Sequence, residues 1–543
     1  MANAIFKIDK PQNEPVLSYA PGTKERVELK KRLAELREQQ IEIPLLIGGK
    51  EVRTGKTGKC IIPHNKNHVI GIYHMAGEEE VKAAIDAALA ARHEWESMPW
   101  EHRAAIFLKA AEMISGPYRS TMNAATMLCQ SKTAHQAEID AACELADMLR
   151  FNVYFMNEIY KEQPESTKDA WNRMEYRPLE GYVFAVTPFN FTSIAGNLPT
   201  APAIAGNVVV WKPASSAVYS AYHVMKILQK AGLPDGVINF VPGPGNVVGE
   251  VAFAHPWFAA LHFTGSSETF QNMWLTVAKN LPNYRTYPRL VGETGGKDFV
   301  FAHPSADIDA LVTALVRGAF EYQGQKCSAA SRAYIPQSIW PEVKQKLLDD
   351  ISTIKMGDVE DFTNFMGAVI DAKAFESIKG YIDFAKQSSE AEIICGGNCD
   401  DSVGFFVEPT VIVTTNPRFK TMEEEIFGPV LTVYVYKDEE LDETLDLCDT
   451  TSVYGLTGAI FAQDRKAIAK MEKRLAHAAG NFYINDKPTG AVIAQQPFGG
   501  ARASGTNDKA GSKINMMRWV SPRAIKELLN PPVDYRYAFM QEP

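Results

Sequence analysis

Long hydrophobic runs are missing from this sequence. No stretch of about 18 consecutive apolar residues occurs in its 543 residues, which excludes a transmembrane helix. A basic surplus is missing as well, since 65 acidic residues outnumber 56 basic ones and the net charge is -9. Non-specific binding to nucleic acid needs a basic surface that displaces counterions, so the composition argues against it. A chain of this length predicts two or three domains.

Cysteine and histidine are scarce, with 7 and 11 residues in the chain. An odd number of scattered cysteines predicts reduced thiols in a reducing compartment. Cys395 and Cys399 lie four residues apart, but no partner follows at the spacing of a zinc site, and we expect no metal. Residues 49–57 (GKEVRTGKT) nearly spell a phosphate-binding P-loop, but five residues separate its glycines where four are required.

The N-terminus has no apolar core of a secretory signal. It also lacks the Arg-rich, acid-poor composition of an organelle transit peptide, so any such segment would already have been removed. Charged residues 22–40 and the amphipathic stretch 102–160 predict helices, the first of them exposed, that serve mainly as scaffold.

Hydrophobic patterning changes near residue 181, where short apolar segments begin to alternate with helical ones. This alternation predicts a parallel sheet with helices on both faces and ligands at the carboxyl ends of the strands. A second alternation, from 306 to about 500, predicts a second α/β domain. The first series has strands at 181–186, 207–211, 237–241, 261–263 and 298–302, with helices at 215–231 and 267–280. The second has helices at 307–320 and 340–354 and strands at 331–336, 430–436 and 456–461.

Residues 322–328 (YQGQKCS) carry the strongest catalytic signal in the chain. A thiol nucleophile must be ionised, accessible and held on a turn, and we expect Lys326 to lower the pKa of Cys327. The alternative is a buried cysteine that acts as a small apolar side chain. The polar neighbours Gln325 and Ser328 argue against that alternative, because a core strand would not carry them.

Two further segments hold residues suited to the chemistry of such a thiol. Glu293, between glycines in residues 291–297 (VGETGGK), is a candidate general base, with an exposed loop acid as the alternative. Asn190 follows a predicted strand and precedes a helix, where its amide can donate to an oxyanion or, alternatively, cap the helix. Glycines at two other strand-to-helix turns, residues 242–249 and 263–266, can bring backbone amides to a pyrophosphate.

Seven motifs occur together in one order: TPFNF, WKPAS, FTGS, ETGGK, GQKCS, EEIFGPV and PFGGARASG. In this combination the chain resembles the aldehyde dehydrogenase superfamily over roughly residues 45–530. The resemblance implies an α/β fold with a Rossmann-like NAD-binding domain, an α/β catalytic domain and a small β oligomerisation flap. The implied boundaries are 1–163 and 181–295 for the NAD-binding domain, 296–516 for the catalytic domain, and 164–180 with 517–543 for the flap and C-terminal strand.

The resemblance also implies roles for individual residues. Cys327 is the expected nucleophile, its own amide and Asn190 form the expected oxyanion hole, and Glu293 is the expected base. Lys212 would bind the adenosine ribose, and Glu425 with Phe427 would hold the nicotinamide ribose and ring. The full set of expected cofactor contacts is Thr187, Phe189, Lys212, Gly245, Phe263, Gly265, Ser266, Ser267, Glu268, Thr269, Gly295, Glu425 and Phe427.

The expected cofactor is NAD, although one position leaves NADP open. Many NAD-preferring relatives carry a glutamate three residues after the ribose-binding lysine, where a carboxylate repels a 2′-phosphate. This sequence has Ser215 there.

Three stretches resemble the Δ1-pyrroline-5-carboxylate (glutamate γ-semialdehyde) dehydrogenase subfamily. They are residues 19–22 (YAPG) in a long N-terminal extension, 324–329 (GQKCSA), and 489–491 (TGA) with 495–507 (QQPFGGARASGTN). The implied reaction is oxidation of L-glutamate γ-semialdehyde to L-glutamate in proline catabolism, through a thiohemiacetal and a thioester. The expected substrate contacts are Ser328, Gly490, Ala491, Phe191 and Phe498.

The sequence leaves alternatives for the substrate ammonium partner, the reaction and the location. Glu144 is a candidate partner for the substrate ammonium, with an exposed acid on a helix as the alternative. Another semialdehyde, an aliphatic aldehyde, or a non-redox thiol acyl-transfer reaction are alternative functions, and a catalytically silent scaffold is a further one. A homodimer is expected, because sheet edges invite pairing. The expected location is the bacterial cytoplasm, with the mitochondrial matrix of the eukaryotic relatives as the alternative.

Overall fold

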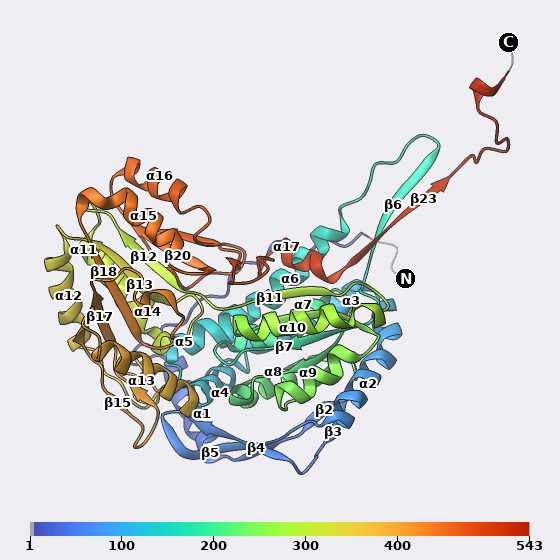
Figure 1. Cartoon of the computed structure of the whole chain (residues 1–543). Coiled ribbons are helices and arrows are strands. Elements are labelled where there is room, and N and C mark those ends of the chain that lie inside the picture. The colour runs from blue at the N-terminus through green and yellow to red at the C-terminus, as the bar shows by residue number, and fades with distance from the viewer. Residues whose placement is uncertain (1–4, 542–543) are drawn as a thin grey trace.

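The computed structural model describes residues 5–541, and two seven-stranded sheets form its body (Figure 1). The first sheet has the order β11-β10-β7-β8-β9-β2-β3, and its first five strands are parallel. These strands are β11 (Arg289–Glu293), β10 (Phe258–Thr264), β7 (Tyr182–Val186), β8 (Val208–Lys212), β9 (Ile238–Phe240), β2 (Leu45–Ile47) and β3 (Lys50–Val52).

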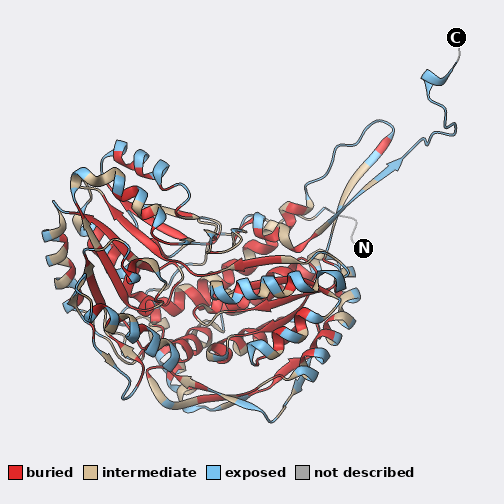
Figure 2. Ribbon diagram, viewed as in Figure 1, coloured by how far each residue is buried: buried red, intermediate tan, exposed pale blue. Residues whose placement is uncertain are grey.

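Chain order reverses in the middle of this first sheet. From β7 the chain proceeds outward through β8 and β9, then crosses back so that β10 pairs with the other side of β7. Ligands of open α/β sheets bind at such a reversal, beyond the carboxyl ends of the strands. Buried strands run through the centre of the layer in Figure 2, with helices on both faces. These helices are α7 (Thr192–Ile204), α8 (Val218–Ala231), α9 (Gly245–Ala254), α10 (Ser267–Asn280) and α2 (Glu78–Ser97).

The second sheet has the order β14-β17-β18-β13-β12-β20-β21, and only β14 runs antiparallel to its neighbour. Its strands are β14 (Ala391–Cys395), β17 (Thr410–Thr414), β18 (Val430–Tyr436), β13 (Ala330–Pro336), β12 (Asp298–Ala302), β20 (Thr457–Phe461) and β21 (Asn481–Ile484). Helices α11 (Ile308–Phe320), α12 (Trp340–Ser352), α13 (Ala372–Lys386), α15 (Leu441–Thr450) and α16 (Arg465–Arg474) pack around it. The predicted strands and helices of both series are confirmed within three residues at their ends. The strand at 298–302, which the sequence placed in the first series, is β12 and belongs to the second sheet.

The N-terminal third differs from its prediction in two ways. Helix α1 (Lys24–Glu38) forms where expected, but it is not exposed throughout, since Leu29, Leu33 and Leu36 are buried in the core. The stretch that resembles a P-loop lies in β3 and the start of β4 (Thr57–Ile62), which pairs with β5 (Asn65–His74), while β1 (Ile41–Ile43) adds a third strand. These strands were not predicted from the sequence, and two of them, β1 and β3, span only three residues each.

Helices α3 (Trp100–Ser115), α4 (Arg119–Gln130) and α6 (Leu145–Tyr160) occupy the predicted helical stretch. A π-helical segment, Glu138–Glu144, precedes α6. Wider turns of this kind are frequent at functional sites. This segment and the start of α6 face the pocket described below, so the region is more than scaffold.

Strands β6 (Ala170–Arg177) and β23 (Ser521–Leu528) form an antiparallel ribbon that projects from the body (Figure 1). The ribbon is mostly exposed in Figure 2, and Trp171 keeps 55% of its surface. Within residues 5–541 no helix combines the length and apolarity needed to cross a membrane. In the same described part of the chain, no group of three or more His, Cys, Asp or Glu side chains is placed to hold a metal ion. All seven cysteines are free thiols.

Candidate active site

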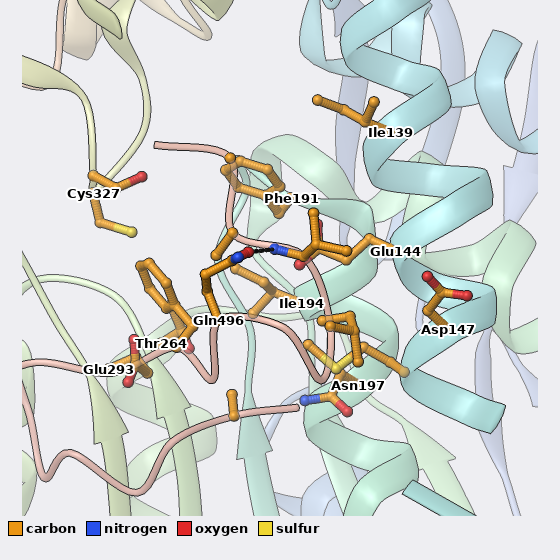
Figure 3. A pocket seen from close by; sticks show the side chains of 18 of the residues that line it. Ile139, Glu144, Asp147, Phe191, Ile194, Asn197, Thr264, Glu293, Cys327 and Gln496 are labelled. Carbon is orange, nitrogen blue, oxygen red and sulfur yellow. Dashed lines mark hydrogen bonds between the residues drawn. The ribbon is translucent and has the colours of Figure 1, made fainter. Parts of the chain in front are cut away.

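A pocket of about 300 Å³ lies where the two sheets meet the π-helical segment. Figure 3 shows Cys327 and Glu293 on one side of this pocket, opposite Glu144 and Asp147. The loop of residues 487–498 and residues 13, 14 and 16 of the N-terminus complete the lining. Segments more than 400 residues apart in the sequence therefore share one cavity.

Cys327 lies on an irregular turn between the buried segment Glu321–Gly324 and β13. Tyr322 and Gln323 have φ angles of 52° and 55°, in the left-handed region that side chains with a Cβ rarely adopt. Hydrogen bonds hold this turn, because Gln323 Nε2 donates to Ala368 O at 2.7 Å and Gln323 Oε1 accepts from Gly367 N at 3.0 Å. Cys327 is half-buried and lines the pocket, so the alternative of an inert core cysteine does not describe it.

The pKa of the Cys327 thiol lies well above its usual value. Burial is the main cause, and the carboxylates of Glu293, Asp298 and Glu425 add to it. The expectation that Lys326 lowers this pKa is wrong, since Lys326 Nζ donates to Glu321 Oε2 at 3.2 Å in a buried ion pair. The resting thiol is therefore protonated and needs a proton acceptor.

Glu293 is the last residue of β11, at the carboxyl end of the first sheet. Burial raises the pKa of its carboxyl to about 8, while Lys509 lowers it and Asp508 raises it further. Its Oε2 atom is buried and accepts no hydrogen bond from any of residues 5–541. A half-buried carboxyl that lines the pocket is not the exposed loop acid of the alternative interpretation.

Asn190 follows β7 and is buried, and its Nδ2 donates to Gln325 O at 3.1 Å, two residues before Cys327. The alternative that Asn190 caps α7 is wrong. Asp140 of the π-helical segment accepts from the first amides of α7 instead, from Thr192 N at 2.9 Å and Ser193 N at 2.8 Å.

The residues expected at the adenosine side of the cofactor lie at the ends of β8, β10 and the start of α9. Lys212 is buried, burial lowers its pKa to about 8, and Pro213 O accepts from its Nζ at 3.1 Å. A Cβ added at Gly245 would come no closer than 3.8 Å to any atom, the Lys212 Cε, so this helix start leaves open space beside the ammonium. A buried cation facing such a space fits a ligand rich in hydroxyl and phosphate oxygens.

The start of α10 carries the next expected contacts. Ser266 caps this helix by accepting from Thr269 N at 3.2 Å, while Glu268 and Thr269 are exposed. Ser267 Oγ donates to Ala503 O at 2.9 Å. Phe263 differs from these residues, because it is buried and stacks on Phe270 with ring centroids 5.5 Å apart. Its ring lies beneath Gly265, where a Cβ would fall 2.6 Å from Phe263 Cζ.

The expected nicotinamide-side residues come together from both halves of the chain. Phe189 and Phe427 meet edge to face at 5.7 Å. Glu425 accepts from Gly296 N at 2.9 Å, and burial raises its pKa to about 7. A Cβ at Gly295 would fall 2.4 Å from Glu425 Oε2, so the close approach of this carboxylate requires glycine. Thr187 is buried, and its Oγ1 accepts from Nε1 of Trp211 on β8 at 3.1 Å.

The expected substrate contacts all line the pocket: Ser328, Gly490, Ala491, Phe191 and Phe498. Ser328 Oγ donates to Thr489 Oγ1 at 2.9 Å, which ties the nucleophile's turn to the loop of Gly490. Glu144 also lines the pocket, and burial raises its pKa to about 8. The alternative that Glu144 is an exposed helix acid is therefore wrong.

Sequence reasoning missed several residues that hold this pocket. Lys132 is fully buried and bonds Asp140 at 2.6 Å, and its ammonium lies 4.0 Å from the centre of the Phe191 ring. Asn13 and Glu14 reach the pocket from the N-terminus. No local pattern identifies Asn13 and Glu14, since their hydrogen-bond partners Asp147 and Arg119 lie over 100 residues away in the chain.

Comparison with known proteins agrees with this arrangement. A family model described as the aldehyde dehydrogenase family matches residues 51–525. The chain belongs to the aldehyde dehydrogenase family.

Several members of this family are similar to it over their whole length. It is 53% identical to the mitochondrial delta-1-pyrroline-5-carboxylate dehydrogenase of Dictyostelium discoideum, over 99% of this chain and 97% of that protein. The human enzyme of the same name is 50% identical, over 98% and 95%. The crystal structure of the delta-pyrroline-5-carboxylate dehydrogenase of Mycobacterium tuberculosis bound with NAD covers all of both chains at 49% identity, with a TM-score of 0.97.

Proposed function

We propose that this aldehyde dehydrogenase oxidises L-glutamate γ-semialdehyde, the open form of Δ1-pyrroline-5-carboxylate, to L-glutamate with NAD in proline catabolism. The names of relatives at 50–53% identity over nearly the whole chain support this substrate. The observation that carries the proposal is one pocket that joins Cys327 and Glu293 to the loop of Gly490 and Ala491. A reactive thiol and backbone donors for a carboxylate then face the same small molecule.

The first step is attack of Cys327 Sγ on the aldehyde carbon. A C–S bond forms, the carbonyl electron pair moves to oxygen, and the thiol proton passes to Glu293, directly or through water. The ionised form of Glu293 accepts this proton, and because the pKa of its carboxyl is about 8, that form becomes more populated as the pH rises toward 8. Asn190 Nδ2 and the Cys327 amide hold the oxyanion, and one such donor is worth about 3 kcal/mol.

Oxidation and hydrolysis follow on the same sulfur. Bound NAD supplies the acceptor for the hydride that leaves the thiohemiacetal carbon, which converts the adduct into a thioester on Cys327. Glu293 first releases the thiol proton to solvent, and its carboxylate then takes a proton from water as the water attacks the thioester carbon. The C–S bond breaks, the carboxylic acid leaves, and the Cys327 sulfur regains a proton from Glu293.

The NAD site in this proposal lies along the carboxyl ends of β7, β8 and β10. The buried Lys212 bonds the adenosine ribose, and the open space at Gly245 receives the pyrophosphate. Glu425 bonds the nicotinamide ribose, with Phe427 and Phe189 beside the ring. The remaining proposed contacts are Thr187, Phe263, Gly265, Ser266, Ser267, Glu268, Thr269 and Gly295. The NAD-bound M. tuberculosis relative supports NAD as the cofactor.

For the substrate, we assign the α-carboxylate to Ser328 and to the amides of Gly490 and Ala491. Phe191 and Phe498 pack on the aliphatic chain. The ammonium of Lys132 over Phe191 holds that ring in place, because a cation above the ring face is attracted to it.

The test is a steady-state comparison of Δ1-pyrroline-5-carboxylate with propanal, each with NAD and with NADP, followed at 340 nm. We expect kcat/KM for pyrroline-5-carboxylate to exceed that for propanal by about 100-fold or more, a difference of about 2.7 kcal/mol in transition-state binding. Equal values would assign the enzyme to general aliphatic aldehydes. Thioester turnover without any need for a nicotinamide cofactor would identify a non-redox acyl-transfer enzyme.

The assembly in this proposal is a homodimer. The proposed domains are residues 1–163 with 181–295 for NAD binding, 296–516 for catalysis, and 164–180 with 517–543 for the flap. Residues 1–4 and 542–543 of these ranges lie outside the part of the chain that the structure describes. The exposed edges of β6 and β23 support pairing with a second copy, since open sheet edges present unpaired backbone groups. Light scattering gives the mass, and a monomer would contradict the dimer. The bacterial cytoplasm is the proposed location, with the mitochondrial matrix as the alternative.

A further inference from the structure

The N-terminal arm, residues 5–22, lies against the rim of the substrate pocket. Asn13, Glu14 and Val16 line the pocket directly. Side chains of the helices beneath fix the arm: Leu17 N donates to Glu138 Oε1 at 2.8 Å, and Tyr19 OH donates to Glu138 Oε2 at 2.7 Å. The arm is therefore a fixed wall of the pocket.

Asn13 joins three separate parts of the chain through one side chain. Its Nδ2 donates to Asp147 Oδ2 on α6 and to Ile493 O, both at 2.9 Å. Its Oδ1 accepts from Gln495 Nε2, also at 2.9 Å. The second Asp147 oxygen accepts from Glu14 N at 2.8 Å. Both ends of the Asn13 amide are thus bonded to the loop that carries Gly490 and Ala491.

This loop has little regular structure of its own. Its internal hydrogen bonds are few, and the Gln496 side chain closes part of it by accepting from Val492 N at 2.9 Å, the bond drawn in Figure 3. Between the two Asn13 partners stands Ala494, with a φ of 64°. A residue with a Cβ rarely adopts this conformation unless its surroundings hold it.

An apolar contact also holds the loop against α6, next to the Asn13 hydrogen bonds. Ile493 packs in a small apolar cluster with Met148 and Phe151 of α6. Apolar contact brings the loop to the helix but does not set the orientation of its backbone, since it is non-directional. The Asn13 amide supplies directional bonds at the same place.

We propose that Asn13 is a positioning residue that fixes the loop of Gly490 and Ala491, so that their amides meet the substrate α-carboxylate. This inference rests on the proposed function. Asn13 acts through the loop, so its loss affects substrates that carry the carboxylate and spares simple aldehydes that lack it.

The experiment compares Asn13→Ala with wild type on pyrroline-5-carboxylate and on propanal. We expect KM for pyrroline-5-carboxylate to rise about fivefold to twentyfold with kcat within about twofold, because the lost bonds position the ligand and not the thiol. The propanal kcat/KM stays within about twofold of wild type. Asn13→Asp keeps the shape and the acceptor but loses both donors and faces Asp147, so it should be at least as impaired as Asn13→Ala.

A matched control lies in the same arm. Lys7 is exposed and forms an ion pair with exposed Asp9, away from the pocket lining, so Lys7→Ala should behave as wild type. Hydrogen exchange of the 487–496 amides gives a readout independent of activity, and we expect faster exchange there in Asn13→Ala but not in Lys7→Ala.

The outcomes separate this inference from the proposed function. Equal losses on both aldehydes with a lowered melting temperature would make Asn13 merely structural and overturn the inference. Unchanged KM and unchanged loop exchange would overturn it as well. If wild type itself prefers propanal, the proposed substrate fails, while the exchange experiment still decides whether Asn13 holds the loop.

Discussion

Replacing Glu293 with glutamine tests two consequences of a buried carboxyl in the pocket: its action as a general base and its effect on the pH dependence of stability. The variant keeps the size of the side chain but cannot accept a proton. General bases contribute about 10²-fold to 10⁴-fold in rate, so we expect kcat to fall within that range. The wild-type rate should rise as the pH passes through about 8, where Glu293 loses its proton, and this limb should be absent in the variant.

The same substitution changes the pH dependence of stability, with a definite sign. Folding raises the pKa of Glu293 from 4.5 to about 8. Between these pH values the native state binds a proton that the unfolded chain has released, so stability falls as the pH rises and the loss is complete above about 8. The full pKa difference between the folded and unfolded states corresponds to a loss of at most about 5 kcal/mol in the free energy of unfolding. Screening around a half-buried side chain reduces it, and we expect about 2 kcal/mol.

The assay is urea unfolding of wild type and Glu293→Gln at pH 5 and at pH 9. From pH 5 to pH 9, the free energy of unfolding of the variant should rise by about 2 kcal/mol relative to that of wild type. The reason is that glutamine acquires no charge that must stay buried. An equal pH dependence of the two proteins would refute the argument that burial raises this pKa. An unchanged rate profile would refute the role of Glu293 as a base.

Three further substitutions test other parts of the site. Asn190→Ala should lower kcat/KM by about 10²-fold to 10³-fold through loss of an oxyanion donor, and a loss below about tenfold in steady-state assays would contradict that role. Lys212→Met keeps the apolar stem but not the ammonium, so the Kd for NAD in fluorescence titration should rise about tenfold or more, and an unchanged Kd would place the ribose elsewhere. Ala491→Pro removes one amide and should raise KM for pyrroline-5-carboxylate by about tenfold without a matching change for propanal, whereas equal losses would contradict the assigned carboxylate site.

Local patterns were sufficient for most of the architecture. The strands 182–186 and 208–212 are rich in β-branched and aromatic residues, as expected for strands buried on both faces. Their alternation with amphipathic helices predicted parallel sheets, and Asn190, Glu293 and Cys327 could be proposed as candidate site residues from the short motifs around them, at a strand end for Asn190 and Glu293 and on a turn before a strand for Cys327. These signals are local, since they depend on residues within about 15 positions of one another.

The pKa of the Cys327 thiol could not be predicted from the sequence, because it depends on burial and on the charges that surround the thiol in the fold. Lys326 is adjacent to Cys327 in sequence, which suggested that it lowers the thiol pKa, but it pairs with Glu321. Burial is the largest cause of the raised pKa of the thiol, and the carboxylates of Glu293, Asp298 and Glu425 raise it further. Adjacency in sequence does not establish which charges face a group in space.

The sequence by itself determined the two α/β units, the order of their elements and which side chains are candidates for the chemistry, because periodicity and turn chemistry are properties of neighbouring residues. Only the tertiary structure decided which groups surround them. The N-terminal arm became a wall of the pocket, and Asn13 reached the carbonyl of Ile493, 480 residues away. Contacts of that range arise when separate elements pack their buried faces together, and no local pattern specifies the partner.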